Sequence, residues 1–220
     1  MTECLEGSMG GNGTSQLDVH AELSAARLDL LVVLEQLEDR DWDKRTLCEG
    51  WRVRDVAAHV AQAPELKVGK VLGGMLKARG NVEKMVDEQA RRGGDREPIE
   101  ILDQLRANVA NDHVPPGTTA EKLLVDTVIH SLDITHPNGW ELNLPADRVR
   151  WALSTFVKLS GPFKGKERAE GLHFDTTDVD WRCGCGDHVR GPAPVVLLAL
   201  AGRRVCDQLS GDGVAALAER

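Results

Sequence analysis

Hydrophobic side chains recur at helical spacing near the start of the chain. Leu23, Leu30, Leu34 and Leu37 follow one another at intervals of seven, four and three residues. These intervals place the four leucines on one face of a helix. The pattern predicts a helix over residues 16–39.

A second helix is predicted where the apolar pattern resumes. Val56, Val60 and Ala63 form one stripe, and the helix covers residues 53–62. Ser15 is the predicted N-cap of the first helix.

Two further helices follow a less regular stretch with helical pieces over residues 64–94. Pro98 suits the first turn of the third helix. Thr118 and Glu121 have the spacing of a capping box at the start of the fourth, which must end by Pro137. Four principal helices joined by loops predict a helix bundle.

The pattern changes after Pro145. Residues 146–159 and 195–209 predict helices, and between them short extended runs flank a glycine-rich turn at residues 183–186 (CGCG). This arrangement is typical of a hairpin. The chain is therefore predicted to be mainly α, with a helical bundle over residues 16–140 and a small α+β domain over residues 141–220. Residues 1–15, which are acidic and rich in glycine, predict a disordered leader.

Composition narrows the class of protein. The chain has 220 residues, 41% of them hydrophobic, and a net charge of −8, which disfavours nucleic acid as a partner. A basic cluster over residues 67–96 is interleaved with acidic residues and is typical of a solvated helix face. The sequence contains neither an apolar run that could span a membrane nor a secretory signal, so a cytoplasmic location is expected.

Two polar residues on the fourth helix suggest metal binding. Asp126 and His130 are four residues apart, so their side chains share one face of the helix. They lie among valines and isoleucine, where a carboxylate and an imidazole are costly to bury without partners. His59 lies in a similar setting on the second helix. Two imidazoles and one carboxylate suit Zn²⁺ and related divalent ions and leave a position open for water or substrate.

Other interpretations of these residues stay open. A histidine on a partly apolar helix is often simply hydrogen-bonded. Asp55 also lies four residues from His59, so one aspartate could bind the metal while another orients a ring nitrogen. Asp133 is a second candidate for that orienting role.

Several other residues attract functional hypotheses. The five cysteines are odd in number and scattered, which favours reduced thiols over a disulfide framework. Cys48 is interpreted as a small buried residue that fixes its loop rather than as a nucleophile. Trp51 is a candidate substrate-binding residue, although a hydrophobic plug is the simpler interpretation. Cys183 and Cys185 could form a second metal site with Cys206, but their Cys-x-Cys spacing favours a turn.

Arg203 and Arg204 follow an apolar helical segment. An arginine at such a place could bind a substrate carboxylate through two parallel hydrogen bonds. A structural salt bridge is an equally good interpretation.

Six segments resemble the mycothiol-dependent maleylpyruvate isomerase family. The resemblance covers residues 17–217, and its most specific parts are the two histidine segments. The segments are LCEGWRVRDVAAH (residues 47–59), DTVIHSLDI (126–134), DVDW (178–181), GPA with AGRR (191–193 and 201–204) and LSGDG (209–213).

The resemblance implies a fold and a ligand set. It implies a DinB-like four-helix bundle followed by a small domain similar to sterol-carrier proteins, with a divalent metal, most simply zinc, bound by a His, acid and His triad. Carried over to this chain, the ligands are His59, Asp126 and His130. The isomerase that names the family has Glu at the middle position, where this chain and many relatives have Asp.

The resemblance also implies a chemistry. The expected function is that of a metal-dependent thiol enzyme, an S-transferase or isomerase that uses mycothiol and a small electrophilic substrate. The alternative is a non-catalytic protein of the same fold that binds a metal or a small molecule, and a hydrolase with a metal-activated water ranks third. The chain is expected to be a monomer or a homodimer.

Overall fold

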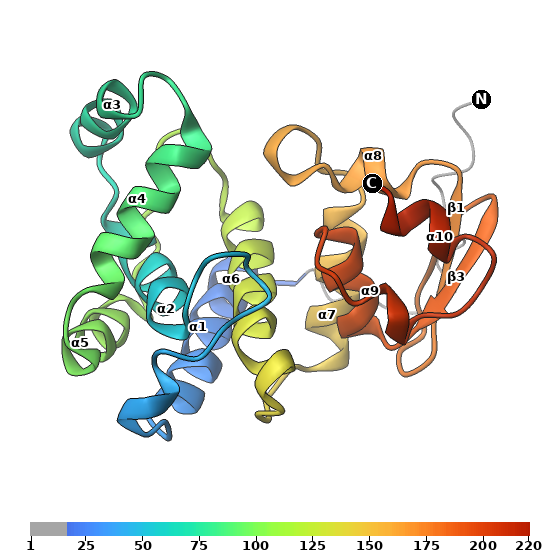
Figure 1. Cartoon of the computed structure of the whole chain (residues 1–220), viewed down its shortest axis with the longest axis horizontal. Coiled ribbons are helices and arrows are strands. Elements are labelled where there is room, and N and C mark those ends of the chain that lie inside the picture. Colours follow the sequence, from blue (N-terminus) through green and yellow to red (C-terminus); the bar gives the residue numbers. More distant parts are fainter. Residues whose placement is uncertain (1–16) are drawn as a thin grey trace. The chain divides into compact units, whose positions relative to one another are not determined.

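The computed structural model describes residues 17–220, which form two compact units, Asp18–Asn143 and Leu144–Arg220 (Figure 1). The predicted fold class is confirmed, because the described chain is mainly helical with one small sheet in the second unit. The predicted leader, residues 1–15, and the predicted cap Ser15 lie outside the described residues.

The first unit consists of helices joined by short loops and 3₁₀ turns. Its helices are α1 (Val19–Leu34), α2 (Val53–Gln62), α3 (Val68–Lys77), α4 (Val82–Gly94), α5 (Pro98–Asn108) and α6 (Ala120–Thr135). Its 3₁₀ turns are Asp39–Asp41, Ala63–Glu65 and His136–Asn138.

Side-chain caps mark where α1 and α6 begin. Asp18, rather than Ser15, caps α1 and accepts hydrogen bonds from the amides of His20 and Ala21 at 3.1 and 3.2 Å. Thr119 caps α6, one residue later than predicted, and its hydroxyl also lowers the pKa of Glu121 through a hydrogen bond. Helix α1 begins at Val19 and ends at Leu34, so it is shorter at both ends than the helix predicted over residues 16–39.

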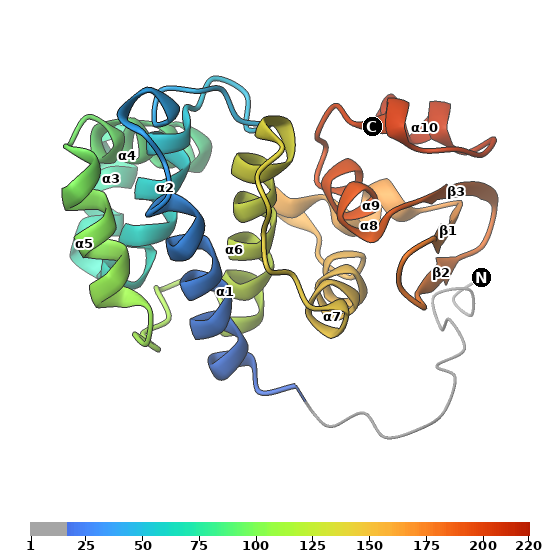
Figure 2. The same ribbon diagram turned by 90° about the horizontal axis from the view of Figure 1, so that it is seen from below.

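Helix α2 lies at the centre of the first unit. It packs against α4, α5 and α6, while α1 and α6 lie side by side (Figures 1 and 2). Its apolar stripe is almost fully buried, as is most of α6, so burial of these faces is the main force that holds the unit together. Members of this core include Leu30, Leu34, Val53, Val56, Val60, Ile101, Leu105 and Ile134.

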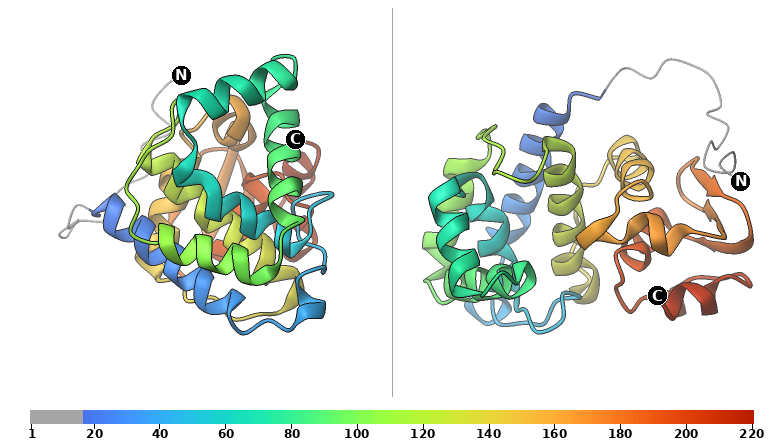
Figure 3. Two further views of the ribbon diagram at one scale, coloured as in Figure 1. Left: turned by 90° about the vertical axis from the view of Figure 1, so that its left-hand side faces the viewer. Right: turned by 90° about the horizontal axis from the view of Figure 1, so that it is seen from above.

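Residues 82–94 form one regular helix, α4, where the sequence predicts a less regular stretch with helical pieces. Its buried residues are Met85, Ala90, Gly93 and Gly94, and the two glycines lie against α2. A Cβ atom at Gly93 would lie 2.9 Å from that of Ala58, and one at Gly94 would overlap the Asp55 carboxylate. The two glycines therefore permit a close approach of helices. Helix α3 crosses one end of α4 (Figure 3, left).

The second unit combines helices with a three-stranded sheet. Its helices are α7 (Ala146–Phe156), α8 (Gly165–Ala169), α9 (Ala193–Leu200) and α10 (Val214–Ala218), with 3₁₀ turns at Gly161–Phe163 and Cys206–Gln208. Its strands are β1 (Leu172–Thr176), β2 (Arg182–Gly184) and β3 (Asp187–Gly191). The buried helix α9 packs against α7 and the sheet (Figure 2). It ends at Leu200, well before the predicted residue 209, because the chain turns at Gly202 with φ +81°.

The prediction of a hairpin around residues 183–186 is wrong. The sheet order is β2-β1-β3, so β1 pairs with β2 antiparallel and with β3 parallel, and the strands on either side of this turn are not neighbours. Gly184 and Gly186 have φ values of +82° and +132°. A Cβ at Gly186 would overlap the carbonyl oxygen of Gly171. The chain can therefore cross closely over the start of β1 and continue on its other edge.

None of the helices described for residues 17–220 combines the length and the apolar character needed to cross a bilayer.

The contact between α2 and α4 gives a stability prediction. We expect Gly94→Ala to lower the free energy of unfolding by about 1–3 kcal/mol, because the added methyl group must displace Asp55 or separate the helices. Urea denaturation measures the change. Gly69→Ala on α3 is the control, since its methyl group meets no atom within 4 Å and should raise helix stability by up to about 1 kcal/mol. Equal stability of Gly94→Ala and the wild type would contradict the close approach.

Candidate metal centre

Two packed helices bring the predicted ligands together. His59 is on α2, and Asp126 and His130 lie one turn apart on α6, which packs against α2. A possible ligand atom from each of the three residues lies within 4.8 Å of the other two. The structure thus places these three side chains as the prediction requires, and their role as ligands stays a prediction.

The Asp126 carboxylate lies between the two imidazoles. Its Oδ2 is 3.3 Å from Nε2 of His59, and its Oδ1 is 3.5 Å from Nε2 of His130. The two imidazole rings meet edge to face, with their centroids 4.9 Å apart. Each carboxylate oxygen therefore faces one ring nitrogen.

Asp133 determines which nitrogen of His130 is available. Its Oδ2 is 3.0 Å from Nδ1 of His130, and its carboxylate is fully buried. A carboxylate accepts at this distance, so Nδ1 carries a proton, and Nε2 is the ring nitrogen left to bind a metal. This is the arrangement by which carboxylates commonly orient metal-binding histidines.

The closeness of the Asp126 carboxylate to two imidazole nitrogens favours a positive charge between them. The lone pair on Nε2 of His130 faces the Asp126 carboxylate, and the two repel unless a proton or a metal ion lies between them. Two imidazole nitrogens and a carboxylate form a donor set that suits Zn²⁺ and related divalent ions. The residues present therefore fit a divalent metal.

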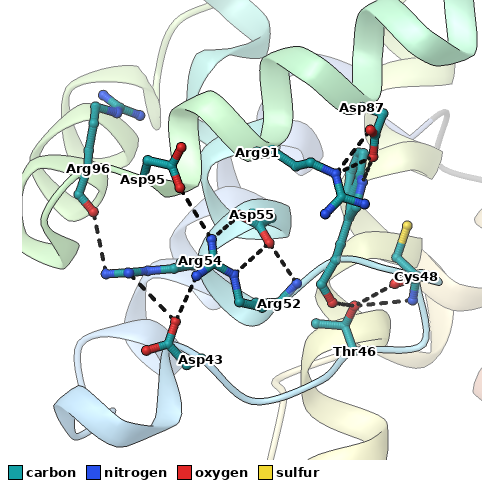
Figure 4. A network of polar contacts seen from close by, with 11 residues as sticks. Asp43, Thr46, Cys48, Arg52, Arg54, Asp55, Asp87, Arg91, Asp95 and Arg96 are labelled. Atoms are coloured by element: carbon teal, nitrogen blue, oxygen red, sulfur yellow. Dashed lines mark hydrogen bonds and ion pairs between the residues drawn. The ribbon is translucent and has the colours of Figure 1, made fainter.

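The structure gives Asp55 a different partner from the one predicted. Its carboxylate accepts hydrogen bonds from the backbone amide, Nε and Nη2 of Arg52, at 2.9, 3.0 and 3.0 Å (Figure 4). The same carboxylate raises the pKa of the Arg52 guanidinium. Asp55 therefore closes the start of α2, and of the two residues predicted to orient a histidine, it is Asp133 that contacts an imidazole.

Trp51 packs against both histidines. Its ring centroid lies 5.4 Å from that of His59 and 6.0 Å from that of His130, and it is nearly parallel to the latter ring. The indole is 8% exposed, and its Nε1 donates to Oδ1 of Asp87 at 2.8 Å. A role in substrate binding stays a prediction. The structure supports the plug interpretation of the side chain and adds a polar contact to α4.

Asp87 and its partner Arg91 were not predicted to lie near the site. Both belong to the basic cluster over residues 67–96, which the sequence analysis assigned to a solvated helix face. Their spacing of four residues on one helix is the signal that could have identified them as a pair. Their contact with Trp51 is tertiary and leaves no periodic pattern in the sequence.

Cys48 lies close to the other edge of His130. Its Sγ, a ring nitrogen of His130 and a carboxylate oxygen of Asp133 lie within 4.8 Å of one another. The backbone amide of Cys48 donates to the hydroxyl of Thr46 at 3.2 Å, which also donates to the carbonyl of Trp51 at 2.9 Å (Figure 4). Cys48 is partly buried rather than buried, and the role of its side chain in fixing the turn stays a prediction.

The remaining candidate residues lie in the second compact unit. The Arg203 guanidinium donates to the carbonyl of Ala201 at 3.2 Å, and Arg204 is exposed. Their role in substrate binding stays a prediction.

Three cysteines of the second unit were also considered as metal ligands. Cys183 is buried and Cys185 is exposed, and burial raises the pKa of the Cys183 and Cys206 thiols. Within residues 17–220, the groups of three or more side chains positioned to hold a metal include none of these cysteines.

Comparison with known proteins agrees with the predicted family resemblance. Residues 23–111 match the family described as the mycothiol maleylpyruvate isomerase N-terminal domain. No curated protein sequence matches the chain closely enough to count as a relative.

Two solved structures have the same fold. The crystal structure of the mycothiol-dependent maleylpyruvate isomerase is similar, with a TM-score of 0.60 and 18% identity over 89% of this chain and 93% of that chain. A variant of that isomerase with a histidine replaced by alanine is similar to the same degree, with 17% identity. The predicted resemblance is therefore confirmed: residues 23–111 of this chain are a mycothiol maleylpyruvate isomerase N-terminal domain, and the chain has the fold of that isomerase.

Proposed function

We propose that the chain is a divalent-metal-dependent thiol enzyme, an S-transferase or isomerase that acts on a small electrophilic substrate, with mycothiol as the thiol. The observation that carries the proposal is the arrangement of Asp126 between Nε2 of His59 and Nε2 of His130. Zinc is the metal that this donor set favours. Mycothiol enters the proposal from the family and from the name of the similar isomerase.

The number and exposure of the ligands favour catalysis over a closed structural site. Three protein ligands leave at least one coordination position for a thiol or water. The side chains of His59 and Asp126 are 18% and 30% exposed, so solvent and small molecules can reach the centre. A bound divalent metal would lower the pKa of a coordinated thiol, so that the nucleophilic thiolate forms near neutral pH.

The protein's own residues hold this chemistry in place. Asp133 keeps the proton of His130 on Nδ1, which leaves Nε2 as a donor atom. Trp51 packs against both imidazole rings. His130 is held on the well-packed helix α6, so its position does not depend on a mobile loop.

The two reaction classes differ in the fate of the carbon–sulfur bond. In both, the thiolate adds to an activated double bond: the carbon–sulfur bond forms as the π bond breaks, and the π electrons move onto the electron-withdrawing group of the substrate, which takes up a proton if the adduct is released. An isomerase breaks that bond again after rotation about the former double bond, so the thiol is returned. A transferase releases the adduct, so one thiol is consumed for each product.

A first prediction concerns the ligands. We expect the wild type to bind one equivalent of Zn²⁺ or Co²⁺ and both His59→Ala and His130→Ala to lose stoichiometric binding, because each substitution removes one of three donor atoms. Metal analysis after gel filtration, with a chelator titration, measures this. His113→Ala is the matched control, since His113 is exposed in a loop. Full metal content in both ligand variants would refute the assignment.

A second prediction concerns Asp133. We expect Asp133→Asn to weaken metal binding by about 10- to 100-fold, because the amide lacks the charge that holds the proton on Nδ1 of His130. Competition with a chromogenic chelator gives the affinity. Asp103→Asn on the exposed surface of α5 is the control for loss of one negative charge. An unchanged affinity in Asp133→Asn would show that the contact does not orient the ring for a metal.

A third prediction concerns turnover. We expect the metal-loaded protein to convert a member of a panel of activated alkenes and other small electrophiles in the presence of mycothiol, and a chelator to abolish this activity. Product mass and free-thiol titration distinguish the two classes, since only transfer consumes the thiol. His130→Ala supplies the background rate. A metal-loaded wild type that turns over no thiol and electrophile pair would favour the non-catalytic binding protein.

A further inference from the structure

The loop that carries Trp51 joins three helices at the metal centre. Trp51 lies two residues before Val53, where α2 begins, and Arg52 caps the helix between them. At the other end of the loop, the amide of Leu47 donates to the carbonyl of Asp133 on α6 at 3.0 Å. The loop is therefore tied by its backbone to the residue that orients His130, and it brings the indole against both imidazoles.

Helix α4 holds the indole from the opposite side. Oδ1 of Asp87 accepts the Nε1 proton of Trp51 at 2.8 Å, and Nε of Arg91 donates to both oxygens of Asp87, at 2.9 and 3.0 Å (Figure 4). An exposed ion pair of this kind contributes little to stability. It does, however, fix the direction of the Asp87 carboxylate, and a hydrogen bond to a charged acceptor is stronger than one to a neutral acceptor.

Gly50 provides independent evidence that the loop lies directly against α4. It adopts φ +78°, which a residue with a side chain rarely adopts, and a Cβ there would lie 2.9 Å from Nη2 of Arg91. Arg91 thus passes over the backbone immediately before Trp51. The loop contacts α4 through its backbone at Gly50 and through the side chain of Trp51.

We propose that Asp87 is a positioning residue for the metal centre. Through its hydrogen bond to Trp51 it sets the angle of the indole, and the indole in turn limits the rotation of the rings of His59 and His130. This inference rests on the proposed metal centre. It adds that α4, which contributes no ligand, determines how well the two imidazoles are preorganised for a cation. Loss of such support for metal ligands typically weakens metal binding by about 10- to 100-fold.

The experiment is a double-mutant cycle on metal affinity. We expect Asp87→Ala and Trp51→Phe each to weaken Co²⁺ binding by about 10-fold or more. Asp87→Ala in the Trp51→Phe background should have little further effect, since both substitutions break one contact. Asp87→Asn retains an oxygen acceptor for the indole and should lie closer to the wild type. Glu83→Gln, an exposed carboxyl one turn earlier on α4, is the matched control.

Two spectroscopic readouts separate positioning from a general loss of stability. The visible absorption of bound Co²⁺ reports ligand geometry and should change in Asp87→Ala even at saturating metal. In the metal-free protein, the indole N–H resonance of Trp51, identified by its absence in Trp51→Phe, should shift in Asp87→Ala. Circular dichroism establishes that each variant is folded before its affinity is compared.

The outcomes distinguish this inference from the proposed function. If the wild type binds Co²⁺ and Asp87→Ala binds it with the same affinity and the same spectrum, the positioning role is refuted and the metal centre stands. Additive losses in the double variant would also refute it, because they would mean that the two residues act independently. A wild type that binds neither Co²⁺ nor Zn²⁺ would overturn the metal centre and the positioning role together.

Discussion

The structure of the site depends on one electrostatic constraint, the position of the Asp126 carboxylate between two imidazole nitrogens. Asp133 holds a proton on Nδ1 of His130, and Nε2 of the same ring, 3.5 Å from the Asp126 carboxylate, repels it unless a proton or a metal ion lies between them. A cation between them turns this repulsion into attraction and joins α2 to α6. Because the ligands come from two helices, a metal that binds here also stabilises the packing of those helices, and metal binding and folding are coupled.

Sequence periodicity predicts which residues belong to the site better than it predicts how their side chains are arranged in space. Asp126 and His130 were identifiable because they occupy one face of a helix that is otherwise apolar. That His59 meets them depends on the packing of α2 against α6, which spacing along the chain does not determine. From their spacing alone, Asp55 and Asp133 were both candidates to orient a histidine ring. They differ because Asp55 already accepts three hydrogen bonds from Arg52 at the start of α2.

The parts of the fold that the sequence did not predict share a physical cause, which is close backbone contact through glycine. Helix α4 buries Met85 and Ala90, and Gly93 and Gly94 let its last turn approach α2 closely. Strand β3 pairs parallel to β1 because Gly184 and Gly186 allow the chain to cross over the start of β1. Periodicity analysis detects large apolar residues. A contact formed by glycines therefore leaves no periodic hydrophobic pattern in the sequence.

The most specific segments of the family resemblance contain the candidate ligands but not every residue that contacts those segments. The segments over residues 47–59 and 126–134 contain the three candidate ligands, Asp133 and Trp51, so a chain that retains both segments retains the chemical groups of the centre. The Asp87 carboxylate that contacts Trp51 lies outside them, on a helix whose outward face reads as an ordinary solvated surface. Two chains with the same ligand segments can therefore differ in how rigidly their imidazoles are held. Metal affinity, which depends on that rigidity, need not follow from the ligands alone.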